Sequence, residues 1–445
     1  MDAVLGKLPR NDNPRVLVGF DNADDAGVYL IARLNWLFVM SPAALIVIAS
    51  IGAFTAFVGA TIGFAQNDIK KVLAYSTVSQ LGYMMLAMGA GAFSAGMFHL
   101  TTHAMFKACL FLGSGSVIMA MHHEQDMRHM GGLKKHMPIT FLTFVIATVA
   151  ICGIFPLAGF FSKDEILWQV FHKGSFAGWY YFLWAMGFVG AAGTAFYMVR
   201  LVVMTFLGES RAVPSGHGAQ QHVVPKESPW NVTLPLVVLA SMSVVLGFLN
   251  IPYIMNHLFG SFSAGLFTEW LSPVIPVAEH GAGLEENGSH GSGLLEWGVM
   301  FLSVAAAAGA MYLSYVMYTR RMDVVQRFTT KFARLHNVVL NKYYVDEAYQ
   351  RFVVDPLLGL NRLCAKFDAV VIDGIVNLVA KVTKLYSVVI GWCDDFFVDG
   401  LVNGLARLTN RMGARLRLIQ TGHIQHYAYV VVAGIVVMLM VKILF

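Results

Sequence analysis

Long apolar runs constrain this chain more than any other feature. A helix needs about 20 mostly apolar residues to cross a bilayer, and eight runs of that kind occur among the 445 residues. Only 13% of the residues are charged and 57% are hydrophobic, against about 25% charged in soluble proteins. These values exclude a water-soluble globular protein and predict an all-α, polytopic membrane helix bundle. The runs lie near residues 43–65, 72–92, 96–121, 138–161 with a continuation to 171, 177–207, 230–254, 294–318 and 427–445.

The front of the chain differs from the rest. Residues 1–26 are polar and have no apolar core followed by a small-residue cleavage site, so they are neither a signal peptide nor a span. A ninth run, residues 27–40, has only about 14 residues and contains Arg33, so it is too short to span and resembles the remnant of a helix. We therefore expect four parts: 1–26, the helices of 27–318, an amphipathic region at 319–426, and a final span at 427–445.

The positions of Lys and Arg predict how the spans are oriented. Cytoplasmic loops of membrane proteins carry an excess of these residues, which also accounts for the net charge of +5 without any nucleic-acid partner. When the loops are placed on alternating sides, one side receives only Lys163, Lys173 and Lys442, so the other side should be cytoplasmic and the C-terminus outside. The rich side collects Lys70, Lys71, Arg128, Lys134, Lys135, Arg211, Lys226, Arg320 and Arg321.

The region before the last span is apolar but periodically interrupted by polar residues. From Arg362 to Arg415 these residues recur at steps of three, four or their sums, which predicts one polar stripe on a helix. Asp355 as cap and Pro356 in the first turn suit a helix start. From there to about Leu418 the helix would be roughly 90 Å long, about three times the thickness of the hydrocarbon core. It should therefore lie along the cytoplasmic surface, with its apolar side on other helices or lipid.

One apolar run contains three titratable side chains on one face. In MFHLTTHAMFKACLF, His99, His103 and Lys107 are spaced i, i+4 and i+8, so a helix aligns them. An ionised lysine in mid-span is costly and should face a wet cavity or a partner, and such a row predicts a proton relay. Alternatives are two hydrogen-bonded core histidines with a snorkelling lysine, a metal site opposed by the lysine, and a b-type haem, which would need a facing histidine.

A second constellation lies where the run from residue 138 is interrupted. The sequence CGIFPLAGFFSKDEIL places Pro156 between two glycines, and then Lys163, Asp164 and Glu165 before the apolar residues resume. Because proline removes a backbone donor and clashes with the preceding turn, we expect a broken helix of the kind that lines ion sites. Lys163 and Asp164 would then lie inside the membrane near its outer side. The alternative is an ordinary loop that exposes both residues.

The four cysteines give no sign of a disulfide framework or a zinc site. Cys109, Cys152, Cys364 and Cys393 lie in apolar or amphipathic runs without paired spacing, so we expect small apolar fillers. Neither a metal nor a cofactor is predicted for the chain.

Four strings carry a resemblance to a known family: QNDIKKVLAYSTVSQLGYM, FHLTTHAMFKACLFL, GFFSKDEIL and IQTGHIQHYAY. From about Gly27 to its end the chain resembles the antiporter-like subunit L of bacterial respiratory complex I, the NADH-quinone oxidoreductase, which is the counterpart of mitochondrial subunit five. The resemblance implies that Lys107 is the central lysine of the second half-channel, with His99 and His103 as its relay and Lys163 with Asp164 as the exit pair.

The resemblance also implies a role and a setting. The chain would be a proton-translocating subunit of the bacterial inner membrane, with no redox chemistry of its own. Its partners would be the bilayer and the other membrane-arm subunits, braced by the amphipathic region as a lateral helix. The family's N-terminal helices of the first half-channel do not occur here, so a separately encoded N-terminal half or a truncation is expected. The alternatives are a subunit of a multisubunit sodium/proton antiporter and a non-pumping scaffold.

Overall fold

The computed structural model describes residues 26–211, 225–255, 265–275 and 290–444. Within these ranges every regular element is a helix, apart from one isolated bridge between Asp68 and Asp126. The chain divides into two compact units, residues 1–346 and 347–445. This architecture confirms the predicted all-α membrane bundle.

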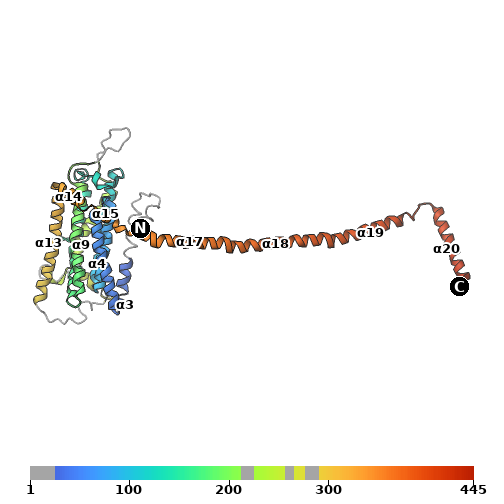
Figure 1. Cartoon of the computed structure of the whole chain (residues 1–445), viewed down its shortest axis with the longest axis horizontal. Helices are drawn as coiled ribbons and strands as arrows, with labels where there is room; N and C mark the ends of the chain where they lie inside the picture. The colour runs from blue at the N-terminus through green and yellow to red at the C-terminus, as the bar shows by residue number, and fades with distance from the viewer. Residues whose placement is uncertain (1–25, 212–224, 256–264, 276–289, 445) are drawn as a thin grey trace, which may run out of the picture. The chain divides into compact units, whose positions relative to one another are not determined.

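The first unit is a bundle whose long helices run side by side (Figure 1). Before them, residues 26–33 are helical and a five-residue helix, α3 (Asn35–Val39), follows. The predicted remnant at 27–40 is therefore helical but broken and short. The remaining elements are α4 (Pro42–Ala65), α5 (Ile69–Ala90), α6 (Phe93–Ala120), α7 (Pro138–Cys152), α8 (Ala158–Gly174), α9 (Trp179–Phe206), α10 (Trp230–Val245), α12 (Leu266–Leu271), α13 (His290–Arg320), α14 (Met322–Lys331) and α15 (Ala333–Leu340).

Fewer helices than expected qualify as membrane spans by length and composition. In the described part of the chain six qualify, α4, α6, α9, the α10 segment to Leu249, α13 and the last helix, whereas the sequence predicted eight. The run at 72–92 forms α5, which is 22 residues long but carries buried polar residues at positions 76, 77, 79 and 80 that lower its hydropathy. The run from residue 138 forms two helices, α7 and α8, of 15 and 17 residues.

The break between α7 and α8 is where the sequence predicted it. α7 ends at Cys152, and Gly153 follows in the left-handed region with φ +77°. Glycine adopts this conformation without a steric penalty. The Phe155–Pro156 peptide is cis, and α8 begins at Ala158.

Glycines allow α4 and α5 to pack with their backbones in contact. A Cβ atom added at Gly82 would lie 2.4 Å from the backbone nitrogen of Ala56, and one at Gly52 would lie 2.4 Å from that of Leu86. Small residues at such crossings replace the hydrophobic driving force that is missing in lipid. At the other end of the pair, the Asp68 carboxylate caps α5 by accepting from the backbone amides of Lys70 and Lys71 at 2.8 and 3.2 Å. α5 is thereby fixed at its start and along one face.

The second unit is built from a long helix and a final apolar helix. The long helix comprises α16 (Val345–Tyr349), α17 (Asp355–Phe367), α18 (Asp373–Cys393) and α19 (Gly400–Arg417), joined by π-helical turns at 350–354, 368–372 and 394–399. The last element, α20 (Ile424–Leu444), has the length and composition of a membrane span. The predicted long amphipathic helix and the final span are both present.

The predicted start of the long helix at Asp355 is wrong. Val354 and Asp355 have helical backbone angles, and the helix continues back through a π turn to Val345. A proline inside an α-helix clashes with the carbonyl four residues earlier, but the wider π turn before Pro356 relieves that clash. Asp355 therefore lies within the helix, where its carboxylate accepts from the Gln350 side chain at 2.8 Å.

Two of the cysteines match the expectation of small buried fillers. Cys109 and Cys152 are buried free thiols in the first unit, whereas Cys364 is exposed and Cys393 is half-buried within the second unit.

Candidate functional site

The row predicted on one face of α6 is buried in the first unit. His99, His103 and Lys107 are exposed by only 1%, 2% and 1%. The Lys107 ammonium donates to the carbonyl oxygen of Leu73 on α5 at 2.8 Å and lies 5.6 Å from the centre of the Phe111 ring. A snorkelling lysine would instead reach toward solvent, so the structure does not support that alternative.

His99 joins three helices through hydrogen bonds. Its Nδ1 atom lies 2.9 Å from the hydroxyl oxygen of Ser162 on α8, and its Nε2 atom lies 3.1 Å from Oε1 of Gln80 on α5. The Thr102 hydroxyl donates to the Ser162 oxygen at 3.0 Å. All four side chains are buried. His99 is therefore held at both ring nitrogens by polar side chains of two other helices.

His103 is arranged differently from His99. Neither of its ring nitrogens has a hydrogen-bond partner within the described residues, although its ring centre is 6.2 Å from that of His99. Its ring also packs edge-on against Phe106, with 5.5 Å between centres. Buried polar groups without a partner are uncommon and call for an explanation.

The break in the helix creates the environment of Lys163. The last carbonyls of a helix have no partner inside the helix, and Lys163 donates to one of them, the carbonyl oxygen of Ile151 in α7, at 3.3 Å. Its ammonium also lies 4.8 Å from the centre of the Tyr83 ring. Lys163 and Asp164 are exposed by only 2% and 8%. The alternative of an exposed loop at this point is wrong, since both residues lie within α8.

One helix, α5, supplies a contact to each of Lys107, His99 and Lys163. Along α5, Leu73 accepts from Lys107, Gln80 bonds with His99, and Tyr83 lies against Lys163. Ten residues of helix separate the first and last of these positions, or about 15 Å at 1.5 Å per residue. The basic side chains are thus spaced along the depth of the bundle rather than gathered at one level.

A cavity large enough for about one water molecule lies beside Asp164. Its volume is about 10 Å³, and it is lined by Asp164, Glu165 and Trp168 of α8 and by Glu296 of α13 among others. The Oδ2 atom of Asp164 has no hydrogen-bond partner among the described residues. Glu296 is half-buried, so the cavity lies between the buried row and the edge of the bundle.

The sequence reasoning missed several polar residues of this region. Gln80, Ser162 and Glu296 are described above. Arg200 on α9 is another, because it is 4% exposed and donates to the backbone oxygen of Gln66 at 2.7 Å and to the side-chain oxygen of Asn67 at 2.8 Å. Glu296 and Arg200 each lie in an otherwise apolar run, and that position alone marks an intramembrane polar residue as a candidate.

The loop between α6 and α7 is held by charge at the capped end of α5. The backbone amide of Met127 donates to the carbonyl oxygen of Asn67 at 2.9 Å, and the side chain of Arg128 bonds with the Asp126 carboxylate at 2.6 Å. Burial works to raise the pKa of Asp126, but the hydrogen bonds and positive charge of Arg128 outweigh it, so the pKa lies below its ordinary value.

Within the described ranges, no three His, Cys, Asp or Glu side chains are grouped to hold a metal ion.

A membrane bundle with lysines, histidines and an aspartate buried in one row is typical of ion-translocating membrane proteins. Residues 22–190 match the family model described as NADH:quinone oxidoreductase/Mrp antiporter, TM. This part of the chain is similar to that family, in agreement with the resemblance that the motifs carry.

The relatives of the chain are subunits of quinone oxidoreductases. It is 40% identical over 434 residues to NAD(P)H-quinone oxidoreductase chain 5 of Picosynechococcus sp., covering 92% of this chain and 58% of the relative. It is 36% identical over 436 residues to NADH-quinone oxidoreductase subunit L of Neisseria meningitidis, covering 93% of this chain and 58% of the relative. The chain therefore spans less than two thirds of the length of these relatives.

One solved structure shows a weaker likeness. The Mrp complex from Dietzia sp. DQ12-45-1b aligns at 20% identity with a TM-score of 0.48, over 94% of this chain and 36% of that chain. The family assignment therefore rests on the sequence matches.

Proposed function

We propose that this chain carries a proton half-channel in the membrane arm of an NADH-quinone oxidoreductase. Lys107 stores the proton, His99 and His103 relay it, and Lys163 with Asp164 releases it. The observation that supports this most directly is the hydrogen bond between His99 on α6 and Ser162 on α8, because Ser162 is the residue next to Lys163. It connects the two basic clusters that the sequence leaves 56 positions apart, between Lys107 and Lys163.

The contacts of His99 suit a group that passes a proton. If Nε2 carries the hydrogen, it donates to Oε1 of Gln80, and Nδ1 accepts from the hydroxyl of Ser162. If Nδ1 carries the hydrogen, it donates to Ser162, whose own hydroxyl then donates to the carbonyl oxygen of Ala158 at 3.1 Å. A turn of the Gln80 amide then presents a donor to Nε2. Both tautomers are therefore accommodated, so Nδ1 could exchange a proton with the hydroxyl of Ser162 while the Gln80 amide holds the ring through Nε2.

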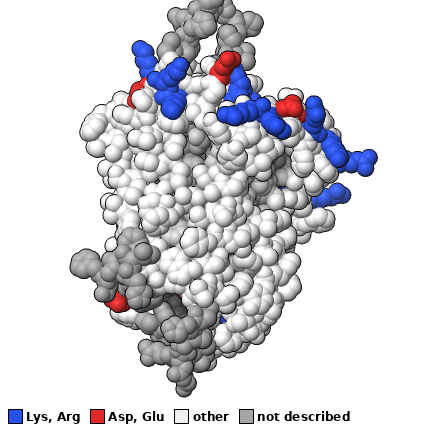
Figure 2. All heavy atoms as spheres, turned by 90° about the vertical axis from the view of Figure 1, so that its left-hand side faces the viewer, with Lys and Arg blue, Asp and Glu red and all other residues white. Residues whose placement is uncertain are grey.

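The direction of transfer follows from the charges at the two ends. Lys107 contacts α5 at Leu73, close to the start of the helix, where Lys70 and Lys71 follow the capping Asp68. Lys163 contacts α5 ten residues further along, at Tyr83. Lys and Arg gather at one end of the face seen in Figure 2. The excess of positive charge on cytoplasmic segments supports an orientation with the start of α5 toward the cytoplasm of a bacterial inner membrane and the release group toward the outside.

Release from Asp164 would proceed through the small cavity beside it. Asp164 and Glu296 both line this cavity, and one water molecule could bridge them. We include Glu296 in the release route because it is half-buried, whereas Asp164 is nearly fully buried. The carboxylate of Glu296 would then accept the proton before it reaches water.

The chain would depend on partners for its driving force. Its relatives are named as subunits of a quinone oxidoreductase, and electron transfer would take place on other subunits. The long amphipathic helix exposes apolar side chains within the second unit, Leu378 at 60% and Leu385 at 65% among them. We propose that these contact neighbouring membrane-arm subunits and that the helix lies along the cytoplasmic surface as a brace.

Two alternatives use the same fold. The matching family model also covers Mrp antiporters, so a subunit of a sodium/proton antiporter is the second candidate. A scaffold without pumping is the third.

Expression of the chain in a strain that lacks subunit L, with and without an N-terminal half of a subunit L, separates the three roles. NADH-driven proton pumping in membrane vesicles supports the proposed role. Sodium-driven proton movement without NADH supports the antiporter, and restored assembly without pumping supports the scaffold.

A further inference from the structure

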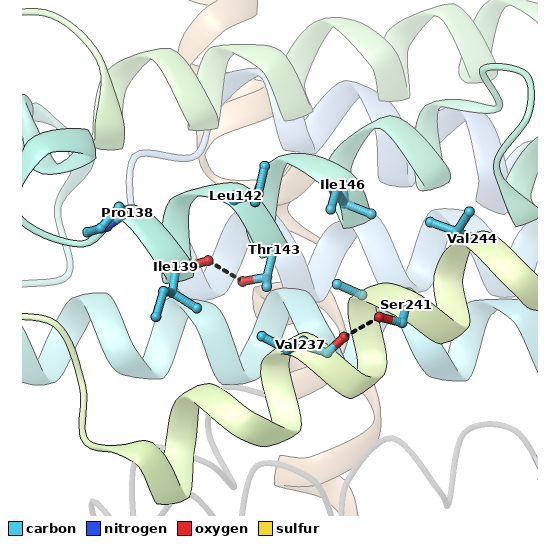
Figure 3. Close-up of a pocket in the computed structure, with 9 residues that line it drawn as sticks. Pro138, Ile139, Leu142, Thr143, Ile146, Val237, Ser241 and Val244 are labelled. Atoms are coloured by element: carbon cyan, nitrogen blue, oxygen red, sulfur yellow. Dashed lines mark hydrogen bonds between the residues drawn. The ribbon is translucent and has the colours of Figure 1, made fainter.

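An open apolar groove runs between α7 and α10 on the surface of the first unit (Figure 3). Its volume is about 450 Å³, which lies within the range of small-ligand sites, roughly 300–1,000 Å³. Ile139, Leu142 and Ile146 line it from α7, and Val237 and Val244 line it from α10. The walls are therefore aliphatic on both sides.

The two hydroxyl groups that line the groove have no free donor hydrogen to offer a ligand. Its two hydroxyl groups both bond within their own helices: Thr143 donates to the carbonyl oxygen of Ile139 at 2.9 Å, and Ser241 donates to that of Val237 at 2.9 Å (Figure 3). A polar occupant would lose its hydrogen bonds to water without replacement. The chemistry of the walls thus fits a hydrocarbon chain.

The groove begins at a charged end of the bundle. Lys135 and His136 are exposed and directly precede the start of α7, and Lys226 is exposed just before α10. The two helix starts are tied together, because the Glu227 carboxylate accepts from the backbone amide of Ile139 at 2.8 Å and from the hydroxyl of Thr140 at 2.6 Å. The Glu227 carboxylate is therefore already bonded at the two helix starts, whereas Lys135 and Lys226 are exposed and can approach an anion.

The length of the groove matches one leaflet of a membrane. From Pro138 to Ile146 it follows eight residues of α7, or about 12 Å at 1.5 Å per residue. Half of a hydrocarbon core is about 15 Å thick. Trp230 in the first turn of α10 is 72% exposed, and exposed tryptophans are enriched where the headgroups meet the hydrocarbon. A chain lying in the groove would have its headgroup level with the lysines.

The geometry points to a binding site for an anionic phospholipid, with one acyl chain in the α7/α10 groove and the phosphate headgroup at Lys135 and Lys226. This site is separate from the buried proton row, and it does not depend on whether the chain pumps protons. Each lysine near an anionic headgroup should favour binding by about fivefold. A zwitterionic lipid with the same acyl chains would fill the groove but gain little from the lysines.

Native mass spectrometry of the purified full chain tests this site. The chain is incubated with dioleoyl phosphatidylglycerol or with dioleoyl phosphatidylcholine, and the bound lipids are counted. We expect phosphatidylglycerol to be retained in preference to phosphatidylcholine. The double variant Lys135→Gln with Lys226→Gln should lose this preference, whereas Lys70→Gln with Lys71→Gln, which changes two lysines outside the groove, should keep it. Equal retention of the two lipids by the unaltered chain would overturn the proposal.

A second pair of variants tests the groove itself. Ser241→Phe adds bulk inside the groove and loses only a hydrogen bond within its own helix. Met242→Phe adds bulk on the neighbouring exposed position, which does not line the groove. The first variant should lose one bound phosphatidylglycerol and the second should not. Equal retention by the two variants would contradict the site, as would a photo-crosslinker at Ser241 that captures a neighbouring protein helix instead of lipid in the assembled complex.

Discussion

The Nδ1 atom of His99 lies 2.9 Å from the hydroxyl oxygen of Ser162. This contact joins α6, which carries the predicted relay, to α8, which carries Lys163 directly after Ser162. The spacing of the sequence predicts His99 as a relay residue, whereas the contact with Ser162 is visible only in the fold. Five predictions follow from this arrangement and from the charges around it.

Replacing Ser162 by alanine should slow proton transfer by about tenfold, the effect of losing roughly 1.4 kcal/mol of hydrogen bonding. The variant removes a partner of both His99 and Thr102 and should also destabilise the fold by about 1–3 kcal/mol. Pumping and thermal unfolding are both measured. Ser114→Ala is the matched control, because the Ser114 hydroxyl donates to the carbonyl oxygen of Phe111 in its own helix at 2.8 Å. Equal pumping by the two variants would remove Ser162 from the route.

Glu296→Gln should slow proton release while assembly is retained. Glutamine has nearly the same shape but does not accept a proton, and Glu296 lines the cavity beside Asp164. Glu269→Gln serves as the control, because Glu269 is exposed on α12 and does not line that cavity. Proton release is followed with a pH indicator after a single turnover of NADH. A release rate that is the same in both variants would show that the proton leaves by another path.

The loop between α6 and α7 should loosen at acid pH. Asp126 has a lowered pKa in the folded chain because Arg128 outweighs the effect of burial. The resulting stabilisation is present above the ordinary pKa of an aspartate and is lost as the pH falls through the lower folded value. Hydrogen exchange of residues 124–130, corrected for its intrinsic pH dependence, measures this. Asp126→Asn should exchange faster at neutral pH and have a smaller acid transition, the remainder coming from Glu124, whose pKa is also lowered by its hydrogen bond from the Asp126 amide. An unchanged transition would exclude Asp126 as a contributor.

The apolar side of the long helix should be required for assembly with neighbouring subunits. Leu378→Lys together with Leu385→Lys places charge on that side, and Asn377→Lys with Thr383→Lys adds the same charge at other positions of the helix. Native gels should show loss of the assembled complex for the first pair, in the same way as deletion of residues 355–418. Intact complexes after that deletion would refute the bracing role.

The sequence alone predicted the parts of the site that depend on a local period. His99, His103 and Lys107 lie on one helix, and their spacing is enough to place them on one face. The break at Pro156 was also predictable, because proline acts on its own turn. The partners Gln80, Ser162 and Glu296 were not, since they meet the row only when α5, α8 and α13 pack against it. The start of the long helix was misjudged at Pro356 because a π turn accommodates a proline that an α-helix would reject.

The most direct test of the central claim, that the buried row transfers protons, is the number of protons pumped per electron in complexes that contain this chain. Lys107→Met removes the buried amine and keeps a side chain of similar length and apolar character, and Lys71→Met removes an exposed lysine of the same bundle as control. We expect both variants to assemble and only Lys107→Met to lower the ratio of protons to electrons. An unchanged ratio in Lys107→Met, with the complex intact, would contradict the claim.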